Sequence, residues 1–386
     1  MSAVRARWAL SSSLFLGSFA WSFVFVSLPF YIQRMSPLDE AATLRWTGWI
    51  LGISSLVTVV TAPISGRLAA RRSPKHFYVA VQFLQSGGFF LMALARTLPQ
   101  MLAARLLLGL MGASSTFAFI MASRHGDARR NVAAIQSAMT LGQVLGPPVG
   151  AVAASRIGFV ESFLVGGVLL WVCGALVGAG VPPQAPPAAG SARAGRVSPR
   201  EVVTACLLVL VASSQIFFLP AILPQVLPRL GVAADDTLEV GGLVIFASGL
   251  AAALGSMAAP RLAEQVGERR AVAGLLAASS ALMAALGAAA GPWSFAVVRF
   301  FQVLCIAPIF PLSVARIAPR ASGGTIGLVN SSRIGAAFLG PVFATTLLSW
   351  APPLAVYLTL AVPGLALVPM LVERRRWHRS PGDRAA

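Results

Sequence analysis

Residues 160–181, VESFLVGGVLLWVCGALVGAGV, form an apolar run that leads directly into residues 182–200, PPQAPPAAGSARAGRVSPR. A helix needs about 20 apolar residues to cross the hydrocarbon core of a bilayer. The first stretch is therefore predicted to span a membrane once. The second stretch is rich in Pro, Gly and Ala and is predicted to be a flexible linker.

The same length criterion identifies apolar runs on both sides of this linker. Together with 160–182, they lie near residues 11–33, 44–65, 77–95, 100–122, 132–153, 201–228, 238–258, 271–290, 293–314, 322–349 and 351–372. Lipid offers no hydrogen bonds to a peptide backbone, so the spans must be helical. The sequence therefore predicts an all-α membrane protein with twelve transmembrane helices.

Composition and charge agree with a membrane protein. Of the 386 residues, 57% are hydrophobic and 11% are charged, against about 25% charged in ordinary soluble domains. The net charge of +18 is interpreted as a topology signal rather than as a nucleic-acid surface, because the basic residues alternate with apolar runs. Most Lys and Arg fall in alternate segments, which predicts both termini in the cytoplasm and an inner-membrane location. The predicted outer segments contain only Arg34, Arg45, Arg96, Arg156 and Arg229.

The chain is predicted to consist of two related halves. Residues 1–182 form one six-helix bundle, 183–200 a cytoplasmic linker, 201–372 a second six-helix bundle and 373–386 a cytoplasmic tail. A shift of 194 residues places Arg67-Leu68-Ala69 on Arg261-Leu262-Ala263, Arg105 on Arg299, and Gly146-Pro147 on Gly340-Pro341. Duplicated bundles are typical of transporters that bind a solute between their halves.

Three motifs resemble those of the major facilitator superfamily, and within it the twelve-span drug:proton antiporters. The segment Gly66–Lys75 is similar to the family's loop between spans 2 and 3, although Ala70 replaces its usual acid and Ser73 its second glycine. Arg105 begins a fourth-span motif in which Leu108 replaces a glutamine. The third motif, Gly142-x3-Gly146-Pro147-x2-Gly150, resembles the fifth-span mark of exporters.

The resemblance implies alternating access, and the following residues are expected to take part in conformational gating: Gly66, Arg67, Arg71, Gly142, Gly146, Pro147, Gly150, Glu264, Gly267, Gly340 and Pro341. Glycines at i, i+4 and i+8 form one smooth helix stripe, which lets helices pack closely in lipid. A plain packing helix is the alternative interpretation of this stripe. Proton coupling is implied by the resemblance alone, with Glu161 or Glu239 as candidate carriers.

Charged residues inside the spans indicate the substrate class. Arg105, Arg299 and Arg333 fall within predicted spans, whereas the acids lie in loops or at span ends. Intramembrane arginines face protein or a wet cavity, and arginine pairs well with carboxylates. A substrate site with an excess of positive charge is therefore predicted. Its other candidate residues are Trp21, Phe25, Gln136, Gln143, Gln302 and Asn330.

These patterns favour a secondary transporter that exports amphipathic anionic or zwitterionic organic compounds, such as drugs, siderophores or metabolites. A metabolite facilitator or importer remains open, as does a membrane scaffold that transports nothing. An enzyme is not expected, because the spans contain no His, Asp or Glu constellation. No cofactor or metal ion is expected, since no metal-ligand spacing occurs and Cys173, Cys206 and Cys305 fall in apolar runs. The expected partners are a small-molecule substrate, lipid and protons, and the chain is expected to be a monomer.

Overall fold

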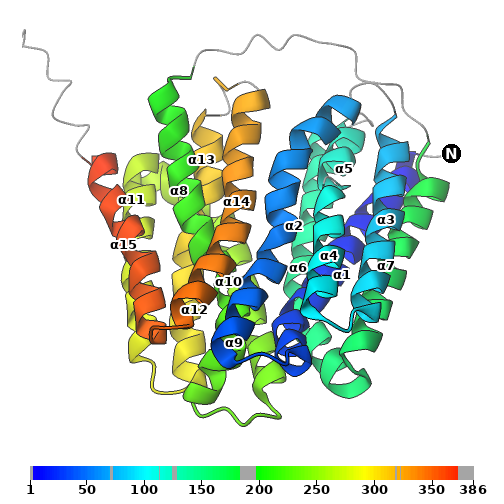
Figure 1. Ribbon diagram of the computed structural model, residues 1–386. Coiled ribbons are helices and arrows are strands. Elements are labelled where there is room, and N and C mark those ends of the chain that lie inside the picture. Colours follow the sequence, from blue (N-terminus) through cyan, green and yellow to red (C-terminus); the bar gives the residue numbers. More distant parts are fainter. Residues whose placement is uncertain are drawn as a thin grey trace, which may run out of the picture. The chain divides into compact units, whose positions relative to one another are not determined.

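The structure is a computed structural model, which describes residues 3–69, 73–112, 114–123, 128–182, 197–317, 320–321 and 323–372. Within these ranges the regular structure is helical (Figure 1). The helices of the first half of the chain are α1 Ala3–Met35, α2 Glu40–Ala69, α3 Pro74–Leu94, α4 Leu98–Leu110, α5 Ser114–Ser123, α6 Ala128–Ile157 and α7 Phe159–Gly180. Those of the second half are α8 Pro199–Phe217, α9 Leu219–Arg229, α10 Thr237–Val266, α11 Glu268–Ala285, the 3-10 turn η1 Leu286–Ala288, α12 Pro292–Ile306, α13 Ile309–Ile317, α14 Gly323–Leu348 and α15 Pro353–Val372.

Three predicted spans are broken helices. The span near 100–122 divides into α4 and α5, the span near 201–228 into α8 and α9, and the span near 293–314 into α12 and α13. Proline explains two of the breaks, because it lacks an N–H and clashes with the preceding turn. Pro220 lies in the first turn of α9 and Pro308 between α12 and α13. The first break begins after Leu110 and contains Gly112, and glycine favours a turn.

Among the described residues, eleven helical segments are long and apolar enough to cross a membrane. The predicted span near 132–153 is not one of them. It belongs to α6, which is long enough at 30 residues but carries polar side chains such as Gln136 and Gln143. The multi-pass membrane character is thus confirmed, whereas the twelfth span stays a prediction.

Contacts between Cα atoms divide the chain into two compact units that differ from the predicted halves. One unit comprises Met1–Ala192, Phe218–Gly249 and Ala337–Trp350, and the other comprises Arg193–Phe217, Leu250–Ala336 and Ala351–Ala386. The domain boundaries inferred from the linker therefore stay a prediction. The linker from residue 183 to residue 196 and the tail from residue 373 onward lie outside the described residues.

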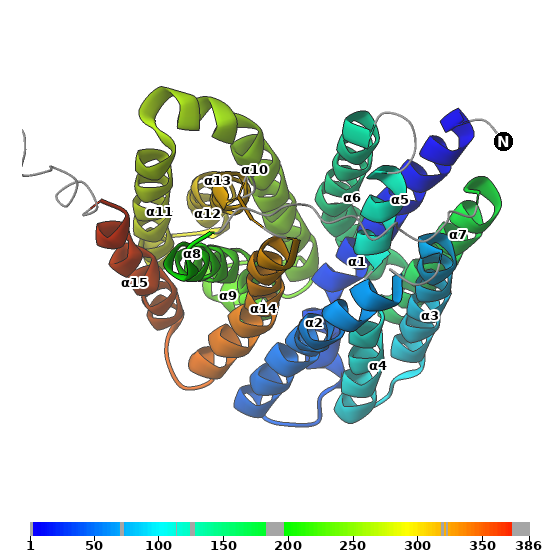
Figure 2. The same ribbon diagram turned by 90° about the horizontal axis from the view of Figure 1, so that it is seen from above.

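Each unit has its own apolar core. In the first, α1 packs along α6 and α7, and α3 lies between α4 and α7 (Figure 2). The largest cluster there includes Phe23, Leu28, Phe89, Met92 and Phe163. In the second unit, α11 packs against α12 and α15, and α8 packs against α13 and α15. Its core cluster includes Leu208, Leu276, Ile306, Ile309 and Leu312.

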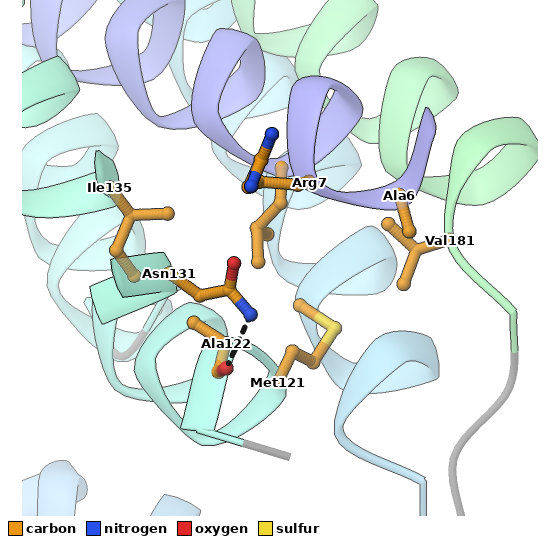
Figure 3. Close-up of a pocket in the computed structure, with 8 residues that line it drawn as sticks. Ala6, Arg7, Met121, Ala122, Asn131, Ile135 and Val181 are labelled. Atoms are coloured by element: carbon orange, nitrogen blue, oxygen red, sulfur yellow. Dashed lines mark hydrogen bonds between the residues drawn. The ribbon is translucent and has the colours of Figure 1, made fainter. Parts of the chain in front are cut away.

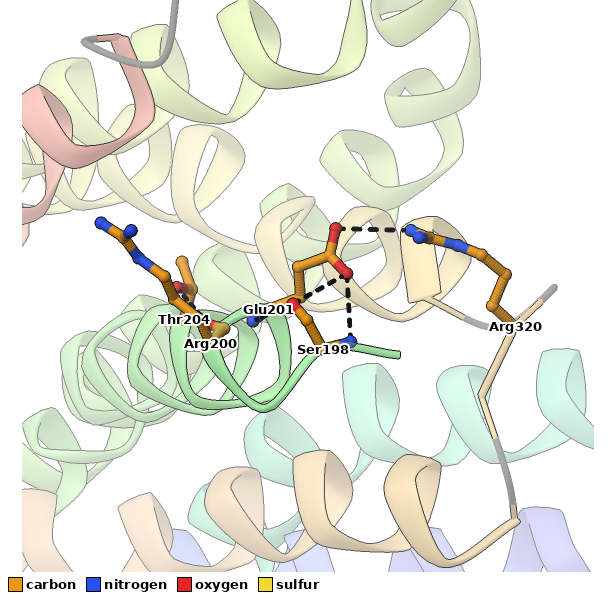
Figure 4. A network of polar contacts seen from close by, with 5 residues as sticks. All are labelled: Ser198, Arg200, Glu201, Thr204 and Arg320. Atoms are coloured by element: carbon orange, nitrogen blue, oxygen red, sulfur yellow. Dashed lines mark hydrogen bonds and ion pairs between the residues drawn. The ribbon is translucent and has the colours of Figure 1, made fainter. Parts of the chain in front are cut away.

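The start of α8 shows how local sequence sets a helix end in the second unit (Figure 4). Ser198 precedes the helix, and the Glu201 backbone N–H donates to its Oγ at 3.3 Å. In return, the Ser198 N–H donates to Glu201 Oε2 at 3.4 Å, as in a capping box. Arg320 forms an exposed ion pair with Glu201 at 3.5 Å. Such pairs contribute little to stability, so the cap is the main determinant of where α8 begins.

Candidate functional site

Arg105 of α4 is buried in the first unit, where it joins α4 to α2. Its exposed fraction is 3%. The guanidinium donates from Nε to the Ile50 carbonyl at 3.1 Å and from Nη2 to the Leu51 carbonyl at 3.0 Å. In the other direction, the Ser54 hydroxyl donates to the Arg105 carbonyl. The arginine is thus satisfied by the α2 backbone, as an intramembrane charge must be.

An aromatic and an amide side chain complete this polar cluster. The Arg105 Cζ lies 5.4 Å from the Trp21 ring centroid, within the range of a cation–π contact. Trp21 Nε1 donates to Gln85 Oε1 at 3.3 Å. Gln85 Nε2 in turn donates to the Met111 carbonyl at 2.7 Å, where α4 ends. The cluster therefore ties α1, α3 and α4 together.

Arg299 of α12 is buried in the second unit, at 1% exposure. It donates from Nη1 to the Gln215 carbonyl at 2.8 Å and from Nη2 to the Ile216 carbonyl at 2.9 Å. It also donates from Nη1 to Gln302 Oε1. Gln302 Nε2 then donates to Gln215 Oε1 at 3.1 Å and to Ser279 Oγ at 2.9 Å. Each of these side chains is closed off from solvent by its hydrogen-bonded neighbours.

The two polar clusters occupy equivalent positions of the predicted repeat. The 194-residue shift relates Trp21 to Gln215, Gln85 to Ser279, Arg105 to Arg299 and Leu108 to Gln302. The Trp21–Gln85 bond has a counterpart in the bond from Ser279 Oγ to Gln215 Oε1 at 2.9 Å. Buried polar groups at paired positions are what the predicted repeat would give. Gln85, Gln215 and Ser279 were missed by the sequence analysis, although applying the shift to Trp21 and Gln302 would have found them.

Arg333 differs from the other two arginines because it is only half-buried. It lies on α14, with its Cζ 4.9 Å above the ring centroid of Phe310 from α13. Asn330, three residues earlier and on the same side of α14, is exposed. A guanidinium stacked on an aromatic ring keeps its N–H edges available for an anionic ligand.

The polar face of α6 is likewise open in the first unit. Gln136 and Gln143 are seven residues apart, so they lie on one side of the helix, and both side chains are exposed. Phe25 and Trp21 of α1 are half-buried and pack against the apolar core. The predicted substrate residues thus separate into three groups. Gln136, Gln143 and Asn330 are exposed, Trp21, Phe25 and Arg333 are half-buried, and Arg105, Arg299 and Gln302 are buried.

The glycine stripe of α6 faces α1, a helix of the same half. A Cβ at Gly142 would lie 2.4 Å from the Phe15 carbonyl oxygen. The corresponding distance is 2.8 Å from Gly146 to the Phe19 oxygen and 2.1 Å from Gly150 to the Phe23 oxygen. Only hydrogen atoms fit in these gaps, so the stripe is the seam that brings the α1 and α6 backbones together.

Two further close contacts join the predicted halves within the first unit. A Cβ at Gly48 of α2 would lie 3.0 Å from the Pro341 carbonyl of α14, and one at Gly52 would lie 2.8 Å from the Phe338 ring. A Cβ at Gly242 of α10 would lie 2.4 Å from Ala151 of α6 and 3.3 Å from the Pro147 carbonyl. Gly340 and Pro341 are themselves buried.

The candidate proton carriers lie at helix starts. Glu161 is exposed in the first turn of α7. Glu239 lies in the first turn of α10, where its Oε1 accepts a hydrogen bond from Ser155 Oγ of α6 at 2.7 Å.

The candidate gating residues in the predicted cytoplasmic loops are only partly described. Glu264 is exposed near the end of α10, and Gly267 has a φ of 84°, which requires glycine between α10 and α11. Gly66 and Arg67 belong to the last turns of α2. Arg71 lies outside the described residues.

A second buried polar network was not anticipated from the sequence. The Tyr78 hydroxyl lies 2.7 Å from Ser13 Oγ and accepts from Gln82 Nε2 at 2.7 Å. Ser13 Oγ also donates to the Cys173 carbonyl at 3.0 Å, so α1, α3 and α7 are linked. The equivalent positions of the second half are apolar, namely Leu207, Val272, Leu276 and Leu367. The signal was the Tyr78–Gln82 pair, one turn apart in an apolar span.

One small cavity opens near the start of α1 (Figure 3). Arg7 and Asn131 line it together with apolar side chains such as Leu10 and Met121. Its volume of about 20 Å³ holds about one water molecule and is far below that of an organic ligand pocket. Among the described residues, no three His, Cys, Asp or Glu side chains are grouped to hold a metal ion.

Apolar helices that carry buried, backbone-bonded arginines define a polytopic membrane protein. The chain belongs to the Major Facilitator Superfamily, whose sequence profile matches residues 10–241. This is a family of membrane transporters and not of enzymes, and the resemblance of the three motifs is confirmed.

Curated relatives and solved structures support this assignment. The staphyloferrin B transporter of Staphylococcus aureus is 32% identical over 34% of this chain and 32% of its own length. The multidrug resistance protein MdtG of Salmonella paratyphi A is 26% identical over 41% of this chain and 40% of its own length. The chain thus matches about a third to two fifths of the length of these curated relatives.

The solved structures match nearly the whole chain. The nucleoside transporter NupG superposes with a TM-score of 0.76 at 12% identity, over 95% of this chain and 98% of its own. The human organic anion transporter MFSD10 (TETRAN) superposes with a TM-score of 0.72 at 17% identity, over 96% and 100%. At such low identity these structures show the shared fold alone.

Proposed function

We propose that this protein is a secondary transporter that exports amphipathic anionic or zwitterionic organic compounds by alternating access. The observation that carries the proposal is Arg333, a half-buried arginine in the membrane-spanning part of α14. Its guanidinium rests on the Phe310 ring, which leaves its hydrogen-bonding edge for a ligand carboxylate.

The distribution of acids supports an anionic rather than a cationic substrate. Every described Asp and Glu lies in a loop or in the terminal turns of a helix, namely Asp39, Glu40, Glu161, Glu201, Asp235, Asp236, Glu239, Glu264 and Glu268. The ion pair found among the described residues, Arg320–Glu201, is exposed and lies outside the mid-membrane region. An organic cation would thus meet no carboxylate at mid-span, whereas an anion would meet Arg333.

The names of the similar proteins support a transporter, and one of them supports an organic anion as substrate. One is named a staphyloferrin B transporter, another a multidrug resistance protein, and a structural neighbour a human organic anion transporter. Export is proposed from the resemblance of the α6 glycine motif to the fifth-span motif of exporters.

Arg105 and Arg299 take supporting positions in this proposal. Their guanidiniums donate to main-chain carbonyls of α2 and α8 and are almost fully enclosed. We assign direct substrate contact to Arg333 of the second unit. Asn330 of that unit, and separately Gln136 and Gln143 of the first unit, are exposed and stay predicted substrate residues.

The polar face of α6 accounts for its low hydropathy, and we include α6 as the twelfth span. Its 30 residues extend over about 45 Å at 1.5 Å per residue, more than the bilayer core needs. Exposed amides at Gln136 and Gln143 are tolerated in a spanning helix that lines a wet cavity.

The glycine contacts support a closing role at the outer ends of the helices. Gly48 and Gly52 receive α14, and Gly242 receives α6. With both termini in the cytoplasm, all of these contacts lie toward the outer side of the membrane. In an alternating-access cycle they would separate when substrate leaves.

Proton coupling would fall to a carboxylate at the same outer side. Glu239 is the better candidate, because its bond to Ser155 joins α10 to α6. A proton on Glu239 would weaken this acceptor and favour opening there.

The experiment uses the purified full chain in liposomes with carboxyfluorescein as the anionic probe, ethidium as the cationic probe and uridine as the nucleoside probe. The expected result is flux of carboxyfluorescein that Arg333→Ala reduces at least about tenfold, because a charge-assisted bond contributes about 1.5–3 kcal/mol. Arg333→Lys is expected to keep part of the flux. Imposing and then collapsing a pH gradient tests the coupling.

The outcomes separate the candidate functions. Flux of ethidium without carboxyfluorescein would contradict the anionic assignment. Uptake of uridine alone would favour a nucleoside importer, and no flux of any probe in either direction would favour a scaffold. Flux of carboxyfluorescein that is unaltered by Arg333→Ala would remove this residue from the substrate site.

A further inference from the structure

The break between α8 and α9 leaves a carbonyl group without its usual donor. In an α-helix each carbonyl accepts from the N–H four residues later. For Ile216 that later residue is Pro220, which has no N–H. An unsatisfied carbonyl is costly in a membrane-spanning segment, so the Ile216 oxygen needs another donor.

Arg299 supplies that donor from a different helix. Its Nη2 donates to the Ile216 carbonyl at 2.9 Å, and its Nη1 donates to the neighbouring Gln215 carbonyl at 2.8 Å. The side chain is 1% exposed and lies in the closed cluster with Gln302. A planar guanidinium is suited to two adjacent acceptors, because its N–H groups are held in a fixed fork.

The equivalent arginine of the first half lacks this proline relationship. Arg105 donates to the carbonyls of Ile50 and Leu51, which belong to the continuous helix α2. The residues four positions later are Ser54 and Ser55, and both have an N–H. Arg105 therefore adds a second donor to carbonyls that already have one, whereas Arg299 replaces a donor that is missing.

We propose that Arg299 is a positioning residue that supplies the hydrogen bond removed by Pro220 and thereby stabilises the broken α8–α9 helix of the transporter. The compact units of the chain also divide between Phe217 and Phe218, at this break. The need for a break during transport rests on the proposed function. The pairing of Arg299 with Pro220 does not, and it can be tested without any flux.

The test is a double-mutant cycle on the purified full chain, read as the thermal unfolding midpoint in detergent. Arg299→Met is expected to lower the midpoint by several degrees. Pro220→Ala restores an N–H at position 220 that can reach the Ile216 carbonyl. The fall in the unfolding midpoint that Arg299→Met causes is therefore expected to be at least halved when the chain also carries Pro220→Ala.

Arg105→Met is the matched control, because its acceptors do not depend on Pro220. Its effect is expected to be the same in the parent chain and in the Pro220→Ala background. If Arg299→Met lowers the unfolding midpoint equally in the parent chain and in the Pro220→Ala variant, the proposal is overturned. Arg299→Met alone could fail to fold and yield no protein from the membrane. In that case, recovery of folded protein carrying both Arg299→Met and Pro220→Ala supports the proposal, and failure to recover that protein overturns it.

Carboxyfluorescein flux gives a second readout that separates positioning from substrate contact. Arg299→Met is expected to lower the maximal rate while the half-saturating probe concentration stays unchanged. A raised half-saturating concentration with an unchanged maximal rate would assign Arg299 to the substrate instead. If no variant and no wild-type sample transports the probe, the proposed function fails while the unfolding cycle still decides the Arg299–Pro220 pairing.

Discussion

Adding one methyl group at Gly150 is expected to destabilise the first unit by forcing α1 and α6 apart. A Cβ there would lie 2.1 Å from the Phe23 carbonyl oxygen and 2.7 Å from the Phe23 Cα. A carbon and an oxygen in van der Waals contact need more than about 3 Å, so the helices must separate by about 1 Å. Both obstacles are main-chain atoms, which cannot rotate away.

The magnitude follows from two opposing effects. Overpacking of this kind lowers the free energy of unfolding by about 3 kcal/mol. Replacing glycine by alanine in a helix raises it by about 0.5–1 kcal/mol. Gly150→Ala should therefore lower the free energy of unfolding by about 2 kcal/mol. In a chain of this size, that corresponds to a fall of about 2–4 °C in the unfolding midpoint. The assay is thermal unfolding of the purified chain in detergent.

Gly87→Ala provides the matched control. Gly87 also lies in a helix, α3, but a Cβ there would meet nothing within 4 Å. This variant should be as stable as the parent or slightly more so. Equal midpoints for Gly150→Ala and Gly87→Ala would refute the interpretation of the stripe as a tight packing seam.

Three further predictions concern other parts of the molecule. Tyr78→Phe should lower the free energy of unfolding by about 1–3 kcal/mol, because it leaves the buried Gln82 amide without an acceptor. Adding Gln82→Leu should restore part of the lost unfolding midpoint. Gly52→Leu should lower carboxyfluorescein flux, since its side chain would occupy the place of Phe338, and unchanged flux would argue against a closing role for this contact. Glu239→Gln should abolish any dependence of flux on a pH gradient without lowering the unfolding midpoint; retained dependence would exclude Glu239 as the proton carrier.

The candidate site could be predicted from the sequence in part. Charge and span position identified Arg105, Arg299 and Arg333 as unusual, and the 194-residue shift paired the first two. Their different surroundings could not be predicted. Whether an arginine is enclosed depends on which main-chain carbonyls lie within hydrogen-bonding distance of its guanidinium. For Arg105 and Arg299, those carbonyls belong to residues about 55 to 85 positions away in the chain.

The glycine stripe illustrates the same limit. Its i, i+4, i+8 spacing predicts a close helix contact, and this contact exists. The spacing says nothing about the partner, because any helix backbone fits against a smooth face. Only the tertiary structure identifies α1 as the partner of Gly142, Gly146 and Gly150, and α14 as the neighbour of Gly48 and Gly52.

The sequence by itself therefore determined that this is a helical, multi-pass membrane protein, and it predicts an internal repeat. Those properties depend on the length and composition of single segments, and lipid leaves a peptide backbone few alternatives. The tertiary structure decided which spans break, which arginines are enclosed and which helix each glycine face meets. These features depend on atoms from distant segments that come within 3 Å of one another, and no local pattern specifies them.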